Sequence, residues 1–483
     1  MLEFDFIINL RCWSSAARAI ERKTKNAISS GLTASLRTLP GRSQKARADF
    51  SLRVFIVSHT LAMPFFQCLA RPSNLQTLAK FRPLCYNHSM VIAEIGTSHE
   101  GSIEKAKRLI DAAKEAEADA VKFQWVIADE ILHPKTGFVD LPTGRIPLYE
   151  RFKQLECPPD FYAKSLEYAR SLGLKWICSP FGLKSLELLL ELKPDAVKIA
   201  SPELNHFPML RALAAARKTY GELQLDGEPK SNEARESNEA AFPAPAAIPV
   251  IVSSGVSKQS DIEAALAVLG KSGVSLLHCV TSYPAPEEEY NVRLIAALKK
   301  DFGVETGLSD HSLDPVLVPC LAASQGATVF EKHITLSKKT SGLDDPVALE
   351  PGQFLQMTRA LRQCQAAINR YGSERGEKEI IAQMSEQYGS ERVQEVLGSG
   401  IKALAPAEEK NYGRTNRSLH YMKAFEAGHV LTADDIGVLR TEKVLTPGLS
   451  PEFLESVIGK KLRRAVQDGA GVAWEDITEE GHL

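Results

Sequence analysis

Residues able to bind protons, anions or metals recur along this chain, each within or just past the end of a short apolar run. The runs are VIAEIG, AVKFQ, WICSPF, AVKIASPE, VIVSSG, LLHCVTSYP, VETGLSDH and TVFEKH. Their polar residues are, in the same order, Glu94; Lys122 and Gln124; Ser179; Lys198, Ser201 and Glu203; Ser253 and Ser254; Thr281 and Tyr283; Ser309, Asp310 and His311; and Glu331 and His333. Carboxylates, ammonium groups, hydroxyls and imidazoles at such regular intervals predict an enzyme.

Two histidines, His311 and His333, end the last two runs and could bind one cation between their imidazoles. Two protein ligands leave positions for water or a substrate oxygen, as in an open catalytic metal site. The neighbouring carboxylates favour a hard ion, Mn²⁺ or Mg²⁺, and zinc is also compatible with this pair. The alternative is that both are structural histidines in a packed interior.

Two lysines, Lys122 and Lys198, lie within apolar runs, where lysine is rarely buried without a partner. They indicate either salt bridges to nearby glutamates or a clamp for the phosphate and carboxylate of an anionic substrate. Hydroxyls from successive runs would complete the clamp: Ser179, Ser201, Ser253 and Ser309. Each serine alone could instead cap a turn. The loop at residues 342–345 could fold over the same site and offer Asp344 to substrate hydroxyls, or could be an ordinary surface turn.

The elements that must hold these residues are strands alternating with helices. After the first run, Ser102 is a suitable N-cap, and the apolar residues that follow it have helical spacing. Eight strands with polar residues at their carboxyl ends predict an α/β protein with a (β/α)₈ TIM barrel. Because side chains alternate along a strand, Lys122 should face the same way as Gln124, and Glu331 the same way as His333.

The rest of the chain divides by composition. Residues 1–89 are rich in Arg, Lys and Ser, which predicts a disordered extension or untranslated sequence before a start at Met90, although a transit peptide has a similar composition. The barrel should span residues 90–370, with a polar insertion at 221–249. Residues 371–413 are charged and amphipathic, which predicts a helical linker. Short strands and turns in residues 414–483 predict a small, mostly-β domain.

Composition also limits the partners. The formal net charge of −2 gives no reason to expect nucleic acid or an anionic membrane as partner. The best apolar run before Met90 is too short to span a bilayer. The eight cysteines are scattered without a CxxC pair, as expected for reduced thiols in the cytoplasm.

Together the motifs resemble the N-acetylneuraminate (sialic acid) synthase family. The matching segments, in family order, are AEIGTSHEG, DAVKFQ, CSPF, VKIASPEL, SSG, HCVTSYP, GLSDHSLD, FEKHIT and GLDDPVALEP. The segments NRSLHYMKAFEAGHVLTADDI and PGLSPEFLESVIGKKL are similar to the antifreeze-like (SAF) domain that ends those enzymes. The resemblance implies a transferase that condenses phosphoenolpyruvate with N-acetylmannosamine or a related amino sugar, giving a nonulosonic acid and phosphate.

The same resemblance implies a role for each site residue. His311 and His333 would hold the divalent metal, while Glu94 and Glu203 would handle the proton and water steps. Residues at the family's phosphoenolpyruvate positions are Lys122, Lys198, Ser179, Ser201, Ser253 and Ser309. Gln124, Tyr283 and Asp344 match positions near the metal or sugar, and Thr281 stands where some members have Asn. Arg440 matches an arginine that reaches from the SAF domain into the other subunit's barrel in a domain-swapped homodimer.

Departures from the family pattern leave the sugar open. They occur at Ser98, at Thr281 and in residues 342–351, all expected near the sugar. A legionaminic, pseudaminic or phosphorylated product is therefore also compatible. The alternative functions are a metal-dependent barrel aldolase, an ulosonate-phosphate synthase, or a non-catalytic sugar-binding protein. For Arg440, the alternative is a surface ion pair with Glu442 or Asp434.

Overall fold

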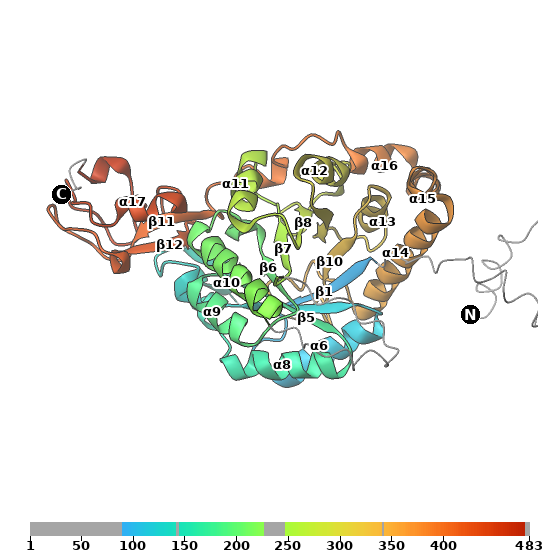
Figure 1. Ribbon diagram of the computed structural model, residues 1–483, viewed down its shortest axis with the longest axis horizontal. Coiled ribbons are helices and arrows are strands. Elements are labelled where there is room, and N and C mark those ends of the chain that lie inside the picture. The colour runs from blue at the N-terminus through green and yellow to red at the C-terminus, as the bar shows by residue number, and fades with distance from the viewer. Residues whose placement is uncertain (1–88, 142–143, 227–246, 341, 479–483) are drawn as a thin grey trace, which may run out of the picture. The chain divides into compact units, whose positions relative to one another are not determined.

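The computed structural model describes residues 89–141, 144–226, 247–340 and 342–478. In this part of the chain, eight parallel strands form a closed barrel in the order β1-β10-β9-β8-β7-β6-β5-β2 (Figure 1). Each run identified in the sequence gives one strand: β1 (Met90–Gly96), β2 (Ala120–Trp125), β5 (Lys175–Pro180), β6 (Ala196–Ile199), β7 (Val250–Ser253), β8 (Val274–Cys279), β9 (Glu305–Asp310) and β10 (Val329–His333). The predicted (β/α)₈ barrel is confirmed. The extension predicted for residues 1–89 lies, apart from Ser89, outside the described residues.

Inside the barrel the side chains form layers, because alternate residues of each strand point inward. One layer is an apolar cluster with a residue from each of seven strands: Ile92, Ala120, Ile177, Ala196, Ile251, Leu277 and Val329. The remaining strand, β9, contributes Gly307, where a Cβ would lie 2.1 Å from the carbonyl oxygen of Val329. No larger residue fits there. Two positions further along each strand lies a second inward layer, which is largely polar.

Helices cover the outside of the barrel (Figure 1). They are α6 (Ile103–Glu115), α8 (Pro159–Ser171), α9 (Leu183–Glu191), α10 (Phe207–Asp226), α11 (Gln259–Leu269), α12 (Leu294–Phe302), α13 (Leu317–Ser324) and α14 (Pro351–Tyr371). The expected N-cap of α6 is present, since the Ser102 hydroxyl accepts a hydrogen bond from Lys105 N at 3.2 Å. Among the described helices, none has the length and apolar character needed to cross a bilayer.

The loop after β2 is elaborated. It contains η2 (Ala128–Glu130), the antiparallel hairpin of β3 (Phe138–Leu141) and β4 (Gly144–Pro147), and α7 (Leu148–Lys153). The loop lies against the C-terminal domain, where Arg440 N donates to the carbonyl oxygen of Ile131 at 2.9 Å.

Two of the predicted segments contain regular helices, as expected for the helical linker at residues 371–413. Helix α10 continues to Asp226, so it includes the start of the insertion predicted at residues 221–249. The predicted linker contains α15 (Ser373–Tyr388) and α16 (Ser390–Leu397), and these helices pack on α13 with Ile380 and Val393 in the barrel's main apolar cluster. Their amphipathic spacing marks a packed face. The segment without a regular helix is residues 398–415, called the linker below.

The C-terminal domain has its own small core. Strands β11 (Arg417–Tyr421) and β12 (Ile436–Arg440) pair antiparallel, and α17 (Leu454–Val457) follows them. The core residues are Leu419, Tyr421, Leu431, Ile436, Val457, Leu462, Val466, Val472 and Ile477. The sequence prediction of a mostly-β domain after Arg414 agrees with this arrangement.

Candidate active site

The second inward layer of the barrel collects eight side chains, one from each strand. They are Glu94, Lys122, Ser179, Lys198, Ser253, Cys279, Ser309 and Glu331, and each is at most 5 % exposed. Six of them are residues that the sequence analysis assigned to the site, brought together here from six different strands. Two ammonium groups and two carboxylates enclosed in this way make a strongly polar interior, which is the strongest candidate for a substrate site.

Lys122 lies between the two carboxylates of this layer. Its Nζ is 2.8 Å from Glu94 Oε1 and 3.6 Å from Glu331 Oε1. It also donates to Ser179 Oγ at 3.5 Å. Burial lowers the pKa of Lys122, but Glu331 and Glu94 outweigh burial, so the pKa is raised and the ammonium stays charged.

Lys198 approaches the same glutamate from the other side. Its Nζ is 3.5 Å from Glu331 Oε1, and Ser309 Oγ donates to that oxygen at 3.0 Å. Burial, only partly offset by Glu331, lowers the pKa of Lys198. Burial raises the pKa of Glu331, but Lys122 and Lys198 outweigh burial and lower it. The salt bridges considered in the sequence analysis are therefore present, and they hold both lysines in one interior.

Three buried oxygens of this layer have no hydrogen-bond partner among the described residues: Glu94 Oε2, Glu331 Oε2 and Ser253 Oγ. A buried polar atom left unpaired costs about 1–3 kcal/mol, so such atoms require a water, an ion or a ligand. Burial also raises the pKa of Glu94, with Lys122 offsetting part of the effect. The layer is therefore arranged to receive a polar ligand, and Glu94 is suited to carry a proton there.

The two histidines lie at the strand ends beyond this layer. Their ring centroids are 5.6 Å apart. His311 Nδ1 donates to the carbonyl oxygen of Val280 at 2.8 Å. Burial lowers the pKa of His311, but Cys279 outweighs burial and raises that pKa to about 9, so a metal ion at Nε2 would have to displace a proton. Burial, followed by the charge on His311, lowers the pKa of His333 well below its usual value. A neutral imidazole is the form that binds metal ions.

This pair fits a divalent cation. A ring nitrogen ligand lies about 2.1 Å from its metal, so rings separated by 5.6 Å have room for one ion between them. A carbonyl on the other nitrogen, as at His311, is the usual support of a metal-binding histidine. In the part of the chain that the structure describes, no three His, Cys, Asp or Glu side chains form a metal site. The Mn²⁺ or Mg²⁺ bound by His311 and His333 stays a prediction.

Gln124, Glu94 and Asp344 meet around Gly96 at the end of β1. Gln124 Nε2 donates to Glu94 Oε1 at 2.8 Å. Gly96 has φ of 56°, and a Cβ there would lie 3.1 Å from Gln124 Nε2 and 3.7 Å from Asp344 Oδ2. The absence of a side chain thus lets these three groups approach one another.

Asp344 comes from the loop that the sequence placed either over the site or on the surface. Its Oδ2 is 3.9 Å from His333 Nδ1. Burial, followed by the charge on Glu94, raises the pKa of Asp344 to about 6. The next residue, Asp345, accepts a hydrogen bond from Ser98 Oγ at 2.6 Å. The loop therefore lies over the barrel mouth and is held there by the loop after β1.

Three further predicted residues lie around the histidines. Ser201 Oγ accepts a hydrogen bond from Gly255 N at 3.1 Å. Thr281 Oγ1 is 3.9 Å from Cys279 Sγ. The half-exposed ring of Tyr283 has its centroid 4.3 Å from that of His311. Thr281 therefore adjoins the polar layer through Cys279, and Tyr283 adjoins His311.

Glu203 has a different environment. It is fully buried in η3 (Ser201–Glu203), and its carboxylate binds two arginines of the C-terminal domain. Arg417 Nε is 2.5 Å from Oε2, and Arg440 Nη2 is 2.6 Å from Oε1. Burial raises the pKa of Glu203, but Arg417 and then Arg440 outweigh burial and lower it. Its expected part in proton and water steps stays a prediction.

Arg440 reaches the barrel of its own chain here, where it pairs with Glu203 and not with the surface acids Glu442 or Asp434. The sequence analysis expected this arginine at a barrel mouth, but that of the other subunit. The exchange between two subunits stays a prediction.

Three residues of the site, Cys279, Glu331 and Arg417, were not predicted as site residues from sequence. Glu331 was identified only as a strand residue and a possible lysine partner, although its shared strand face with His333 was a usable signal. Arg417 had no local signal, because its partner Glu203 is 214 positions away in the chain.

Comparison with known proteins agrees with this geometry. The NeuB family model matches residues 109–220 and 241–372, and the SAF domain model matches residues 416–478. Spore coat polysaccharide biosynthesis protein SpsE of Bacillus subtilis is 29 % identical over 393 residues, covering 80 % of this chain and 93 % of that protein. Its crystal structure aligns with a TM-score of 0.63 at 28 % identity, covering 81 % of this chain and 96 % of that one.

Other relatives carry names of acid synthases. N,N'-diacetyllegionaminic acid synthase of Legionella pneumophila is 26 % identical over 398 residues, covering 80 % of this chain and 94 % of that protein. N-acetylneuraminate-9-phosphate synthase of Mus musculus is 26 % identical over 394 residues, covering 80 % of this chain and 92 % of that protein. With half of its length matched by the family model across the barrel that holds the site, this chain belongs to the NeuB family.

Proposed function

We propose that this NeuB-family enzyme condenses phosphoenolpyruvate with N-acetylmannosamine or a related amino sugar, giving a nonulosonic acid and phosphate. The observation that carries the proposal is the polar layer, where Lys122 and Lys198 face an interior with three unpartnered oxygens, below two histidines. Relatives named as legionaminic, pseudaminic and N-acetylneuraminate-9-phosphate synthases support this class of product.

The lysines are suited to the anionic substrate. Glu94 and Glu331 balance the two ammonium charges, so an incoming phosphate and carboxylate must compete with them. Because burial raises the pKa of Glu94, proton uptake by Glu94 would leave two ammonium groups facing one carboxylate. The hydroxyls of Ser179, Ser201, Ser253 and Ser309 are then available to the substrate's oxygens.

The reaction balances as phosphoenolpyruvate, sugar and water giving acid and phosphate. Carbon 3 of phosphoenolpyruvate attacks the aldehyde carbon of the open-chain sugar and forms the new C–C bond. Water adds to carbon 2, and the C–O bond to phosphate breaks to leave a 2-keto acid. A divalent ion held by His311 and His333, Mn²⁺ or Mg²⁺, would supply Lewis-acid polarisation of the aldehyde.

The remaining side chains have roles that follow from their environments. Glu94 can transfer a proton in the polar layer, since its Oε2 is unpartnered and its pKa is raised. Gln124 holds the other oxygen of Glu94 in place. Thr281, Tyr283 and Asp344 lie at the entrance, where the sugar's hydroxyl and acetamido groups would contact them.

The test is phosphate release from phosphoenolpyruvate. The purified protein is incubated with Mn²⁺ or Mg²⁺ and with each of N-acetylmannosamine, its 6-phosphate, and the precursors of legionaminic and pseudaminic acids. We expect release that depends on one sugar, with a matching 2-keto acid by mass spectrometry. Phosphate release in the absence of any sugar would contradict the proposal. So would the absence of phosphate release with every sugar in the panel. Retro-aldol cleavage of a nonulosonic acid to pyruvate would instead indicate an aldolase.

A further inference from the structure

One buried carboxylate of the linker collects three backbone N–H groups. Glu408, in η5 (Pro406–Glu408), is 1 % exposed. Its Oε1 accepts from Thr281 N at 2.6 Å and from Val256 N at 2.7 Å, and its Oε2 accepts from Ala405 N at 3.3 Å. All three partners are donors, so both oxygens act as acceptors, as in an ionised carboxylate. The two short bonds go to the barrel, to the loops after β7 and β8.

These two loops carry groups that line the candidate active site. Ser253 ends β7 directly before the first loop, Thr281 belongs to the second loop, and Gly255 N of the first loop donates to Ser201 Oγ. A Cβ on Gly255 would lie 2.0 Å from Thr281 Oγ1, 2.9 Å from Ser201 Oγ and 3.1 Å from Glu408 Oε1. The glycine therefore lets the linker carboxylate and two substrate-binding hydroxyls meet at one point. A shift of Glu408 would displace its partners Val256 N and Thr281 N, which belong to the two loops beside these hydroxyls.

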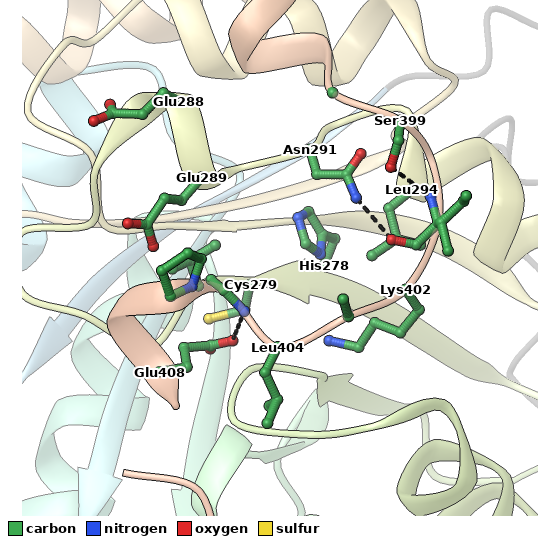
Figure 2. A pocket seen from close by; sticks show the side chains of 16 residues that line it. His278, Cys279, Glu288, Glu289, Asn291, Leu294, Ser399, Lys402, Leu404 and Glu408 are labelled. Atoms are coloured by element: carbon green, nitrogen blue, oxygen red, sulfur yellow. Dashed lines mark hydrogen bonds between the residues drawn. The ribbon is translucent and has the colours of Figure 1, made fainter. Parts of the chain in front are cut away.

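Lys402 of the linker and Asn416, the first residue after it, hold the loop after β7 as well. Lys402 Nζ donates to the carbonyl oxygen of Ser254 at 3.1 Å, and Asn416 Nδ2 donates to that of Val256 at 3.0 Å. Figure 2 shows Glu408 and Lys402 beside His278 and Cys279 of β8. Val256 is thus bound through its N–H and its carbonyl group, and its φ of 41° lies in the left-handed region. A non-glycine residue keeps such a conformation only where its surroundings impose it.

We infer that Glu408 is a positioning residue, which fixes the loops after β7 and β8 so that Ser201, Ser253 and Thr281 meet the substrates in a defined geometry. This rests on the proposed function, because the loops are assigned to substrate by that proposal. The linker that leads to the C-terminal domain then also sets the geometry of the barrel mouth.

Three variants of Glu408 and one control test whether its hydrogen bonds to the loops or its charge determines activity. Glu408→Ala removes all three bonds, and Glu408→Asp keeps the charge but is one methylene too short to reach both loops. In Glu408→Gln the amide oxygen can still accept hydrogen bonds from Val256 N and Thr281 N. Its NH₂ group can then face Ala405 N, where the wild-type hydrogen bond is the longest of the three. Glu409→Ala, at the exposed neighbouring position, is the matched control.

We expect Glu408→Ala and Glu408→Asp to lose about 10- to 100-fold in kcat/KM, as found for displacements near 1 Å of groups that orient a substrate. The loss should include a higher KM for phosphoenolpyruvate. Glu408→Gln and Glu409→Ala should stay within threefold of wild type. Amide hydrogen exchange, followed by mass spectrometry on peptides that contain Val256 and Thr281, should accelerate only in the Ala and Asp variants.

Each outcome has one meaning. Wild-type kcat/KM in the Ala or Asp variant, or unchanged exchange at both amides, would overturn the inference. A loss of kcat/KM in Glu408→Gln as large as that in Glu408→Ala would also overturn the inference, because the charge of Glu408 and not the placement of the loops would then matter. A wild-type protein that releases no phosphate with any sugar would refute the proposed function, and the exchange data, which need no turnover, would still decide whether Glu408 holds the two loops. If Glu408→Ala does not fold, the Asp and Gln pair carries the same test.

Discussion

Replacing Arg417 by methionine should destabilise the contact between the C-terminal domain and the barrel. Arg417 is 2 % exposed, and its Nε is 2.5 Å from Glu203 Oε2. Its Nη atoms donate to four backbone carbonyls, those of Glu130, Ile131, Val438 and Phe181. Methionine fills a similar volume but donates nothing, so the variant would leave one carboxylate oxygen and four carbonyls without this partner.

The magnitude follows from these contacts. Breaking a buried ion pair by removing one partner costs about 3–5 kcal/mol. Because Arg440 still neutralises Glu203 through Oε1, we expect the lower end, about 3 kcal/mol, which is roughly 100-fold in the unfolding equilibrium. The double variant Arg417→Met with Glu203→Gln should lose less free energy of unfolding than the sum of the two single variants, since no carboxylate is then left unpaired.

The assay is urea unfolding, monitored by hydrogen exchange in peptides of the C-terminal domain, so that separate unfolding of the two domains is detected. The matched control is Arg211→Met. Arg211 also links the barrel to that domain, but through an exposed pair with Glu455 at 3.9 Å. Exposed pairs contribute at most about 1 kcal/mol. A loss below about 1 kcal/mol for Arg417→Met, or equal losses for the two variants, would refute the reasoning.

Three further predictions concern pH, the metal and the N-terminal segment. Burial lowers the pKa of His99, His278 and His420 to about 4 and that of His206 to about 3. Below pH 6.5 the unfolded chain therefore binds protons that the folded protein does not, and stability should fall by about 2 kcal/mol per histidine at pH 5. Urea unfolding midpoints measured from pH 7.5 to 5 check this, and His278→Gln should make the midpoint depend less steeply on pH. His311→Ala and His333→Ala should each weaken Mn²⁺ binding measured by calorimetry and abolish most activity, and full activity after EDTA treatment would contradict the metal site. A chain that begins at Met90 should fold and release phosphate at the wild-type rate, and an insoluble product would show that the preceding residues belong to the fold.

The barrel was predictable because its signal is local. Each barrel strand has four to seven residues, and most strands are largely apolar. The period of two places Glu94, Lys122 and Lys198 two positions beyond an inward apolar residue. Strand ends of a parallel barrel meet at one face, so the convergence of the polar layer follows once the strands are identified.

The contacts of the linker and the C-terminal domain were not predictable in this way. Arg417 and Glu408 are single charged residues whose partners, Glu203 and the amides of Val256 and Thr281, are more than 100 positions away. No periodicity records such a pairing. The same applies to α15 and α16, whose amphipathic pattern shows that one face is buried but does not show against what.

The surroundings of each carboxylate in the structure distinguish its role more clearly than its place in a sequence motif does. A group that transfers protons needs a pKa near the working pH. Burial raises the pKa of Glu94 and brings that of Asp344 to about 6, whereas Arg417 and Arg440 hold the pKa of Glu203 low. Proton transfer is therefore expected from Glu94 or Asp344, while we expect Glu203 to remain ionised. That charge orients the guanidinium of Arg440 through Nε and Nη2, and the planar pair fixes the direction of the remaining N–H groups at the edge of the barrel mouth. We therefore expect an ionised Glu203 to hold Arg440 of the C-terminal domain at the edge of the barrel mouth.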